Sequence, residues 1–284
     1  MSLLVFGQTG QVARALARLA PEATYLGRDR ADLTDPAACA QAILQARPTA
    51  VINAAAYTAV DKAESDEATA HLVNALAPEA MAQACATLGV PLVHISTDYV
   101  FDGAGDAAFL PTAPVAPLGA YGRTKAEGEA RLRATGAVHA ILRTSWVFSA
   151  DGANFVKTML RLSETRDRLT VVGDQTGGPT PAAAIAQACL TIAARLREDP
   201  ALSGSYHFSG APATTWAAFS RAIFALSGRK VEVVDIPTAD YPTPARRPLN
   251  SRLDGTSTLA AFGLAPPDWQ AGLRDTLIQL EALA

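Results

Sequence analysis

Two hydroxyl side chains, one carboxylate and one lysine have the types and spacing of an acid–base site. Thr97 and Asp98 end an apolar run that reads as a buried strand, and Tyr121 and Lys125 stand four residues apart at the expected start of a helix. On a helix this spacing places both side chains on one face. A neighbouring ammonium favours the phenolate, so we expect the pKa of Tyr121 to fall below its ordinary value of about 10. Tyr121 would then donate a proton to a substrate oxygen held by the Thr97 hydroxyl.

Alone, a Tyr-x-x-x-Lys pair has an ordinary explanation as a chance pair on a helix surface. The catalytic interpretation needs a dinucleotide site upstream, and the chain begins with a candidate. An apolar strand expected at 2–6 runs into a G-x-x-G-x-x-A turn, Gly7, Gly10 and Ala13, and then into an amphipathic helix at 12–19. Gly7 permits a tight turn, Gly10 lets a pyrophosphate approach the helix N-terminus, and Ala13 allows close packing of helix on strand.

The end of the second expected strand, at 24–27, bears on the choice of cofactor. Folds that bind NADH usually carry an acid there for the ribose 2′-hydroxyl, whereas arginine suits the 2′-phosphate of NADPH. Arg28 and Arg30 therefore favour NADPH, while Asp29 keeps NADH as the alternative. A solvated charged turn is the non-functional explanation of the same residues.

Composition argues against several classes of partner. The chain has 284 residues, is 49% hydrophobic and carries a formal charge of −3 without a basic run, which argues against nucleic acid as a partner. No apolar run reaches the roughly 18 residues of a membrane span and no signal peptide is recognisable, so we expect a cytoplasmic protein with no membrane partner. Cys39, Cys85 and Cys189 are too widely spaced for a disulfide framework or a zinc site, and we expect them to be buried.

The order of the expected elements predicts an α/β fold. Strands at 50–54, 90–95 and 137–142 alternate with helices, and Asp35 followed by Pro36 predicts that one of these helices starts at residue 36. This alternation is typical of a Rossmann-type doubly wound parallel sheet. The small residues that follow the strand at 50–54 would let a flat cofactor lie against the backbone, although simple close packing explains them equally well.

The carboxyl-terminal third differs in character from the rest of the chain. After Gly204 the elements shorten and proline becomes frequent, which indicates a smaller α/β lobe for the substrate. Residues 1–147 are expected to form the dinucleotide-binding domain, with 165–200 returning to it. The substrate lobe would then consist of residues 148–164 and 201–284. A polar turn at 173–181 stands out because no packed core would need it.

Six motifs spread over nearly the whole chain resemble the extended branch of the short-chain dehydrogenase/reductase family. They are N-A-A-A-Y-T-A-V-D-K-A-E (53–64), S-T-D-Y-V-F (96–101), Y-G-R-T-K (121–125), R-T-S-W-V (143–147), D-Q-T-G-G-P-T (174–180) and Y-P-T-P-A-R-R-P-L-N-S (241–251). The first three are widespread in the family, whereas R-T-S-W-V and P-T-P-A-R-R-P are typical of members that reduce a nucleotide-linked keto sugar. The resemblance implies NAD(P)H-dependent reduction of the C4 keto group of dTDP-4-dehydro-L-rhamnose to dTDP-L-rhamnose.

The resemblance also implies roles for individual residues. Tyr121 would protonate the forming alkoxide, Lys125 would hold the nicotinamide ribose and lower the pKa of Tyr121, and Thr97 would hydrogen-bond the sugar oxygen. The side chains expected to bind the sugar nucleotide, besides Thr97 and Tyr121, are Asp98, Trp146, Asn154, Arg246 and Arg247, with Asn154 and the arginines as candidates for its diphosphate. The residues expected to contact the cofactor, besides Tyr121 and Lys125, are Gly7, Thr9, Gly10, Gln11, Val12, Arg28, Asp32, Leu33, Ala54, Ala55, Ala56, Tyr57 and Thr58.

Several alternatives stay open at this point. The chain could reduce or epimerise another nucleotide sugar, or act as a non-catalytic nucleotide-binding regulatory subunit, although the intact Tyr121 and Lys125 disfavour the last. The family resemblance implies a dependence on Mg2+, but no acidic cluster in the sequence indicates where the ion would bind, so we assign no metal ligands. The sequence does not determine the oligomeric state, and a homodimer is one candidate.

Overall fold

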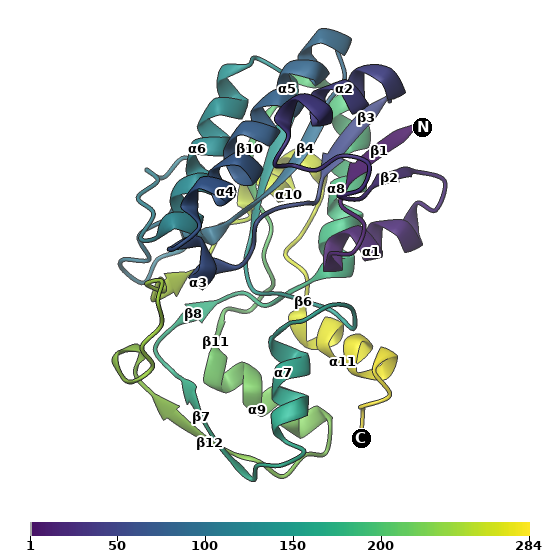
Figure 1. Cartoon of the computed structure of the whole chain (residues 1–284). Coiled ribbons are helices and arrows are strands. Elements are labelled where there is room, and N and C mark those ends of the chain that lie inside the picture. The colour runs from purple at the N-terminus through teal and green to yellow at the C-terminus, as the bar shows by residue number, and fades with distance from the viewer. Residues whose placement is uncertain (1) are drawn as a thin grey trace.

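The computed structural model describes residues 2–284, which form two lobes (Figure 1). The larger lobe is built on a six-stranded sheet in which every neighbouring pair is parallel. In spatial order its strands are β10 (Gly204–His207), β5 (His139–Thr144), β4 (Leu92–Thr97), β3 (Ala50–Asn53), β1 (Leu3–Phe6) and β2 (Thr24–Leu26). The strand order reverses between β1 and β3, and open α/β sheets bind their ligands at such a switch point. The predicted Rossmann-type doubly wound sheet is confirmed.

Helices cover both faces of this sheet because its strands are buried on both sides. On β1, Leu3 and Val5 pack toward one helical layer, whereas Leu4 and Phe6 pack toward the other. The first layer contains α1 (Gln11–Leu19), α8 (Ala182–Glu198) and the end of α10 (Thr256–Phe262). The second layer contains α2 (Pro36–Ala46), α5 (Ala77–Leu88) and α6 (Ala120–Ala134). The chain enters α5 through three short elements: α3 (Val60–Ala63), α4 (Glu67–His71) and a π-helical turn (Leu72–Leu76).

The smaller lobe has its own apolar core. This core lies among α7 (Phe155–Leu162), α9 (Trp216–Leu226) and α11 (Trp269–Gln279), which gather at the bottom of Figure 1. Three small sheets accompany these helices: β7 (Arg168–Val172) with β12 (Glu232–Ile236), β8 (Thr176–Gly177) with β11 (Thr214–Thr215) and β13 (Asn250–Ser251), and β6 (Val147–Phe148) with β9 (Thr180–Pro181). The short 3-10 turns of the chain are Asp98–Val100, Pro200–Leu202 and Thr238–Asp240.

The course of the chain between the lobes differs from the expected division in two places. Strand β7 pairs with β12 and buries its apolar residues in the small-lobe core, although we placed 165–200 with the dinucleotide domain. Strand β10 instead extends the large sheet beside β5, although we placed 201–284 in the substrate lobe. Both pairings join segments more than sixty residues apart, so local patterning could not assign them.

Two sequence expectations hold for side chains of the large lobe. Asp35 caps α2, since its Oδ1 accepts a hydrogen bond of 3.1 Å from the backbone N–H of Ala38. Cys39, Cys85 and Cys189 are free and buried, and burial raises the pKa of each thiol to about 12. Within residues 2–284, no helix combines the length and apolar character that crossing a bilayer requires.

A buried ion pair fastens α6 to the large sheet. The Glu129 carboxylate on α6 accepts hydrogen bonds from Arg143 Nε (2.9 Å) and Nη2 (2.6 Å) on β5, and from Ser96 Oγ (2.6 Å) on β4. The Arg143 and Glu129 side chains are only 2% and 0% exposed. Burial acts to raise the pKa of Glu129, but the hydrogen bonds and charge of Arg143 and the Ser96 hydroxyl outweigh it and hold the pKa below its ordinary value.

Replacing Arg143 by Met should destabilise the protein by about 3–5 kcal/mol, because it leaves a buried carboxylate without its main partner. Urea unfolding at neutral pH measures this change. Since the pKa of Glu129 lies below its ordinary value of about 4.3, the contribution of the pair is complete above that pH and is lost as the pH falls further.

Arg168→Met is the matched control for Arg143→Met. It breaks the exposed pair between Arg168 and Glu232, whose side chains are 64% and 66% exposed, and should cost no more than about 1 kcal/mol. An equal, small loss in both variants would show that the buried pair does not hold the lobe together.

Candidate active site

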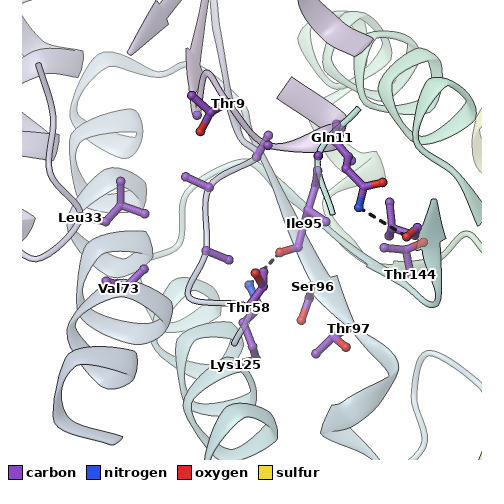
Figure 2. Close-up of a pocket in the computed structure, with 18 of the residues that line it drawn as sticks. Thr9, Gln11, Leu33, Thr58, Val73, Ile95, Ser96, Thr97, Lys125 and Thr144 are labelled. Atoms are coloured by element: carbon purple, nitrogen blue, oxygen red, sulfur yellow. Dashed lines mark hydrogen bonds between the residues drawn. The ribbon is translucent and has the colours of Figure 1, made fainter. Parts of the chain in front are cut away.

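One cavity of about 820 Å3 lies at the carboxyl ends of the large-sheet strands and contains most of the predicted site residues. Figure 2 shows Thr9 and Gln11 of the glycine turn on one side of it, and Ser96, Thr97 and Lys125 on another. The predicted residues that line it are Gly7, Thr9, Gly10, Gln11, Val12, Arg28, Asp32, Leu33, Ala54, Ala55, Ala56, Thr58, Thr97, Asp98, Tyr121, Lys125 and Trp146. A dinucleotide turn and an acid–base group therefore share one space.

The glycine turn leaves the N-terminus of α1 open to an anion. Gly7 has φ +111°, and a side chain there would also crowd the backbone carbonyl group of Ala54 on the adjacent strand end, with Cβ at 3.3 Å. Gly10 is the N-cap of α1 and supplies no capping side chain, so the first-turn N–H groups keep their hydrogen-bonding capacity. A Cβ built at Gly10 meets nothing within 4 Å, which leaves room for a ligand against the backbone. These features fit a pyrophosphate.

The loop after β2 presents charged groups at the rim of the cavity. The Arg28 side chain is 86% exposed, and its Nε lies 4.0 Å from Asp32 Oδ2. Asp32 accepts a 2.9 Å hydrogen bond from the backbone N–H of Thr34, which is the main cause that lowers the pKa of its carboxyl group. The guanidinium of Arg28 is therefore free to turn toward an anion, since its contact with Asp32 is long and solvent-exposed.

Strand β4 and helix α6 bring Thr97, Tyr121 and Lys125 together. Thr97 is the last residue of β4, and its hydroxyl accepts from the backbone N–H of Tyr99 (3.2 Å) and donates to Asp98 Oδ1 (3.0 Å). Tyr121 is the second residue of α6, and Lys125 follows one turn later on the same face. Lys125 Nζ donates to the backbone carbonyl of Ile95 at 2.8 Å, the bond drawn in Figure 2.

The pKa of Tyr121 moves opposite to our expectation. Burial raises it to about 12, the neighbouring Thr97 hydroxyl partly opposes this rise, and the charge of Asp98 adds to it. The expected lowering by Lys125 is wrong for this structure, because desolvation dominates the shift of the Tyr121 pKa and the Lys125 charge is not one of its causes. Desolvation also lowers the pKa of Lys125 itself to about 8. The phenol consequently keeps its proton at neutral pH.

Two polar atoms in the cavity wall are buried without a hydrogen-bond partner. They are Asp98 Oδ2 and Thr144 Oγ1, which both belong to residues that line the cavity. Burial raises the pKa of Asp98 to about 6, although the Ser251 and Thr97 side chains oppose the rise through hydrogen bonds. Buried polar atoms usually have partners, so these two fit a site that a polar ligand completes.

Sequence reasoning missed the contact of Lys125 with His94. Lys125 Nζ lies 3.0 Å from His94 Nε2, and His94 Nδ1 lies 3.1 Å from Asn53 Nδ2. All three side chains are buried, and burial and the Lys125 charge hold the pKa of His94 well below its ordinary value. Only the adjacency of β3, β4 and α6 in the fold creates this chain of contacts.

Four predicted residues lie outside the lining of the cavity. The Tyr57 hydroxyl donates to Asp66 Oδ2 (3.0 Å), and Asn154 caps α7 through a 3.2 Å bond from the Lys157 N–H. Arg247 Nη2 donates to Asp61 Oδ2 at 2.6 Å, whereas Arg246 is exposed. Three of the four thus serve local structure in this conformation, and Arg246 alone among them keeps an exposed guanidinium.

Residues 2–284 contain no group of three or more His, Cys, Asp or Glu side chains that could hold a metal ion.

Lys125 should titrate near pH 8. NMR of protein labelled with 13C at lysine Cε should show one signal with a midpoint of about 8, because burial disfavours the ammonium. The signal should disappear in Lys125→Met, which assigns it. A midpoint at the ordinary lysine value of about 10.4 would contradict the buried environment described above.

Known proteins match this chain over nearly its whole length. The family model described as RmlD substrate binding domain matches residues 1–282. A dTDP-4-dehydrorhamnose reductase of Sinorhizobium fredii is 46% identical over 283 residues, which cover 96% of each chain. The corresponding reductase of Escherichia coli is 42% identical, with 99% of this chain and 98% of the relative covered.

Solved structures agree with these relatives. A dTDP-4-dehydrorhamnose reductase of Clostridium acetobutylicum superimposes with a TM-score of 0.91 at 33% identity, covering 99% of this chain and 100% of its own. The Bacillus anthracis reductase, solved in complex with NADP, gives a TM-score of 0.90 at 33% identity and covers 98% of this chain and 100% of its own. The chain therefore belongs to the dTDP-4-dehydrorhamnose reductase family that the RmlD substrate binding domain model describes.

Proposed function

We propose that the protein reduces the C4 keto group of dTDP-4-dehydro-L-rhamnose to dTDP-L-rhamnose, with NADPH as the reductant. The observation that carries this proposal is that Thr97, Tyr121 and Lys125 line the same cavity as the glycine turn at the start of α1. The names of the relatives supply the substrate, since five of them match nearly the full length of this chain at 40–46% identity.

The residues present fit a nicotinamide dinucleotide. The open N-terminus of α1 suits the pyrophosphate, and the small residues Ala54, Ala55 and Ala56 leave space beside the strand ends. Arg28 at the rim suits a 2′-phosphate, and the Bacillus anthracis relative binds NADP, so NADPH is preferred over NADH. When bound, the cofactor supplies the hydride that adds to C4 of the sugar.

Tyr121 is the proposed proton donor. With its pKa raised to about 12, the phenol is fully protonated at neutral pH, and it can protonate the strongly basic sugar alkoxide that hydride addition forms at C4. The proton moves from the phenol oxygen to that alkoxide oxygen. Thr97 holds the same sugar oxygen through its hydroxyl, and Lys125 stabilises the resulting phenolate by its charge.

Lys125 has a second role in this proposal. Its ammonium carries three N–H donors, of which one binds the Ile95 carbonyl and another faces His94 Nε2. The third is available for the nicotinamide ribose. On the substrate side, Asp98 and Trp146 contact the sugar. Asn154 already caps α7, which leaves the two arginines as candidates for the diphosphate. Arg246 is exposed, and Arg247 Nη1 is buried without a hydrogen-bond partner although Nη2 donates to Asp61.

Absorbance of NADPH, and separately of NADH, with dTDP-4-dehydro-L-rhamnose generated in situ tests the proposed reaction. We expect loss of absorbance in proportion to the sugar, with dTDP-L-rhamnose as product. An epimerase would recycle its cofactor and leave the absorbance unchanged, and a regulatory subunit would bind the cofactor without turnover. Either result would overturn the proposed function.

Tyr121→Phe should lower turnover by about 100- to 10,000-fold, the usual contribution of a positioned general acid, while NADPH binding stays nearly unchanged. Steady-state kinetics and cofactor titration separate the two quantities. Tyr206→Phe is the matched control, because it removes a hydroxyl that only binds the Leu202 carbonyl (2.7 Å) at the sheet edge. Unchanged turnover in Tyr121→Phe would exclude Tyr121 as the proton donor.

Arg28→Ala should raise the Kd for NADPH roughly tenfold, because a charge-assisted hydrogen bond is worth about 1.5–3 kcal/mol and this one is solvent-exposed. The Kd for NADH should stay the same. Arg195→Ala on the outer surface of α8 removes a comparable charge far from the cavity and should change neither value. Equal effects of Arg28→Ala on the two cofactors would argue against a 2′-phosphate contact.

A further inference from the structure

Trp146 occupies an unusual backbone position in the cavity wall. It lies between β5 and β6, lines the cavity together with Thr97 and Asp98, and has φ +48°. The left-handed region is rare for a bulky residue and is kept only where the surrounding structure enforces it. Trp146 must therefore be held in place by its neighbours.

Two elements of the small lobe hold the Trp146 indole. The Trp216 ring stacks on it, with ring centroids 3.6 Å apart and planes inclined by 10°. The backbone of Gly177 approaches the same indole so closely that a Cβ at this position would lie 2.6 Å from Trp146 Cε2 and 2.9 Å from Nε1. The indole thus has little freedom to rotate.

Trp216 is itself fixed by a buried amide. Its Nε1–H donates to Gln175 Oε1 (3.2 Å), and Gln175 Nε2 donates to Thr238 Oγ1 (3.1 Å), so the amide is bound at both ends. Phe155 also packs against Trp216, and the two ring centroids lie 4.5 Å apart. Gln175 and Gly177 belong to the polar turn at 173–181, which no packed core would need. Their contacts with Trp216 and Trp146 give this turn a structural role.

We propose that Gln175 and Trp216 are positioning residues, which hold the Trp146 indole as a fixed wall of the sugar subsite and so orient the sugar toward Tyr121 and Thr97. The inference rests on the proposed function, because it assigns the sugar to this end of the cavity. Asp98 Oδ2, which is buried without a partner, marks the same end as a place for a ligand with hydroxyl groups.

The stack of Trp146 and Trp216 should affect turnover of the sugar and not binding of the cofactor. A misplacement of about 1 Å at the reacting carbon can lower the rate about 100-fold, so loosening the wall should reduce turnover of the sugar. Neither Gln175 nor Trp216 lines the cavity, and the glycine turn proposed for the cofactor reaches the Trp146 wall only through Gln11, whose Nε2 donates to the Val147 carbonyl at 3.4 Å. Cofactor affinity should therefore be insensitive to both residues.

The test uses the whole chain with three substitutions, one control variant and three readouts. Trp216→Leu should abolish the exciton couplet that stacked indoles give in circular dichroism, and should lower kcat/KM for dTDP-4-dehydro-L-rhamnose by about 10- to 100-fold with the Kd for NADPH unchanged within about twofold. Trp216→Phe keeps an aromatic ring in the stack and should restore most of the activity. Gln175→Leu keeps the Trp216 ring but removes the acceptor of its Nε1–H, and should weaken both the couplet and kcat/KM.

Trp269→Phe is the matched control, because Trp269 lies in the same lobe and donates to the Pro212 carbonyl (2.7 Å) away from the cavity. It should leave both the couplet and kcat/KM intact. Wild-type kcat/KM in Trp216→Leu or Gln175→Leu despite a lost couplet would overturn the inference alone. Equal losses in the control and in cofactor affinity would also overturn it, since they indicate general destabilisation. A wild-type protein that does not oxidise NADPH would overturn the proposed function, and this inference with it.

Discussion

The Glu129 carboxylate is the constraint on which the site depends. It lies with no exposed surface between α6, β4 and β5, and it accepts hydrogen bonds from Ser96 and Arg143. Ser96 immediately precedes Thr97, and Lys125 lies one helical turn before Glu129. The same ion pair that holds the helix on the sheet therefore fixes the distance between the strand-borne hydroxyl and the helix-borne phenol and ammonium. An uncompensated charge at this depth would be costly, so the ion pair favours this register of the three elements.

Burial also sets the protonation states in the cavity. Desolvation disfavours every charged form, so it raises the pKa of Tyr121 and Asp98 and lowers that of Lys125. The outcome is a phenol that holds its proton until a strong base appears beside it, which suits a donor to an alkoxide. The lysine, in contrast, keeps its charge only near or below about pH 8. The pKa values that suit Tyr121 and Lys125 to their proposed roles are therefore set mainly by burial, and less by the interaction between the two side chains.

The sequence predicted the local features of this site well, because each follows from chemistry within a few residues. The strand–turn–helix at the start of the chain, the cap at Asp35 and the shared face of Tyr121 and Lys125 are all of this kind. Features that arise from packing of distant segments were not predictable. The contact of His94 with Lys125 and the return of β10 to the large sheet need the folded topology. The direction of the Tyr121 pKa shift was wrong for the same reason, since the sequence shows the neighbouring lysine but not the depth of burial.

The two lobes divide the work of the proposed reaction, with the large sheet providing the glycine turn and the acid–base group and the small lobe supporting Trp146. The central claim is that hydride from the cofactor reaches C4 of the sugar. NADPH deuterated at the transferable position of C4 of its nicotinamide ring, incubated with dTDP-4-dehydro-L-rhamnose, tests it directly. NMR of the product should show one deuterium at C4 of dTDP-L-rhamnose and none at its other carbons. A product without deuterium at C4, or with deuterium at another carbon, would contradict the account.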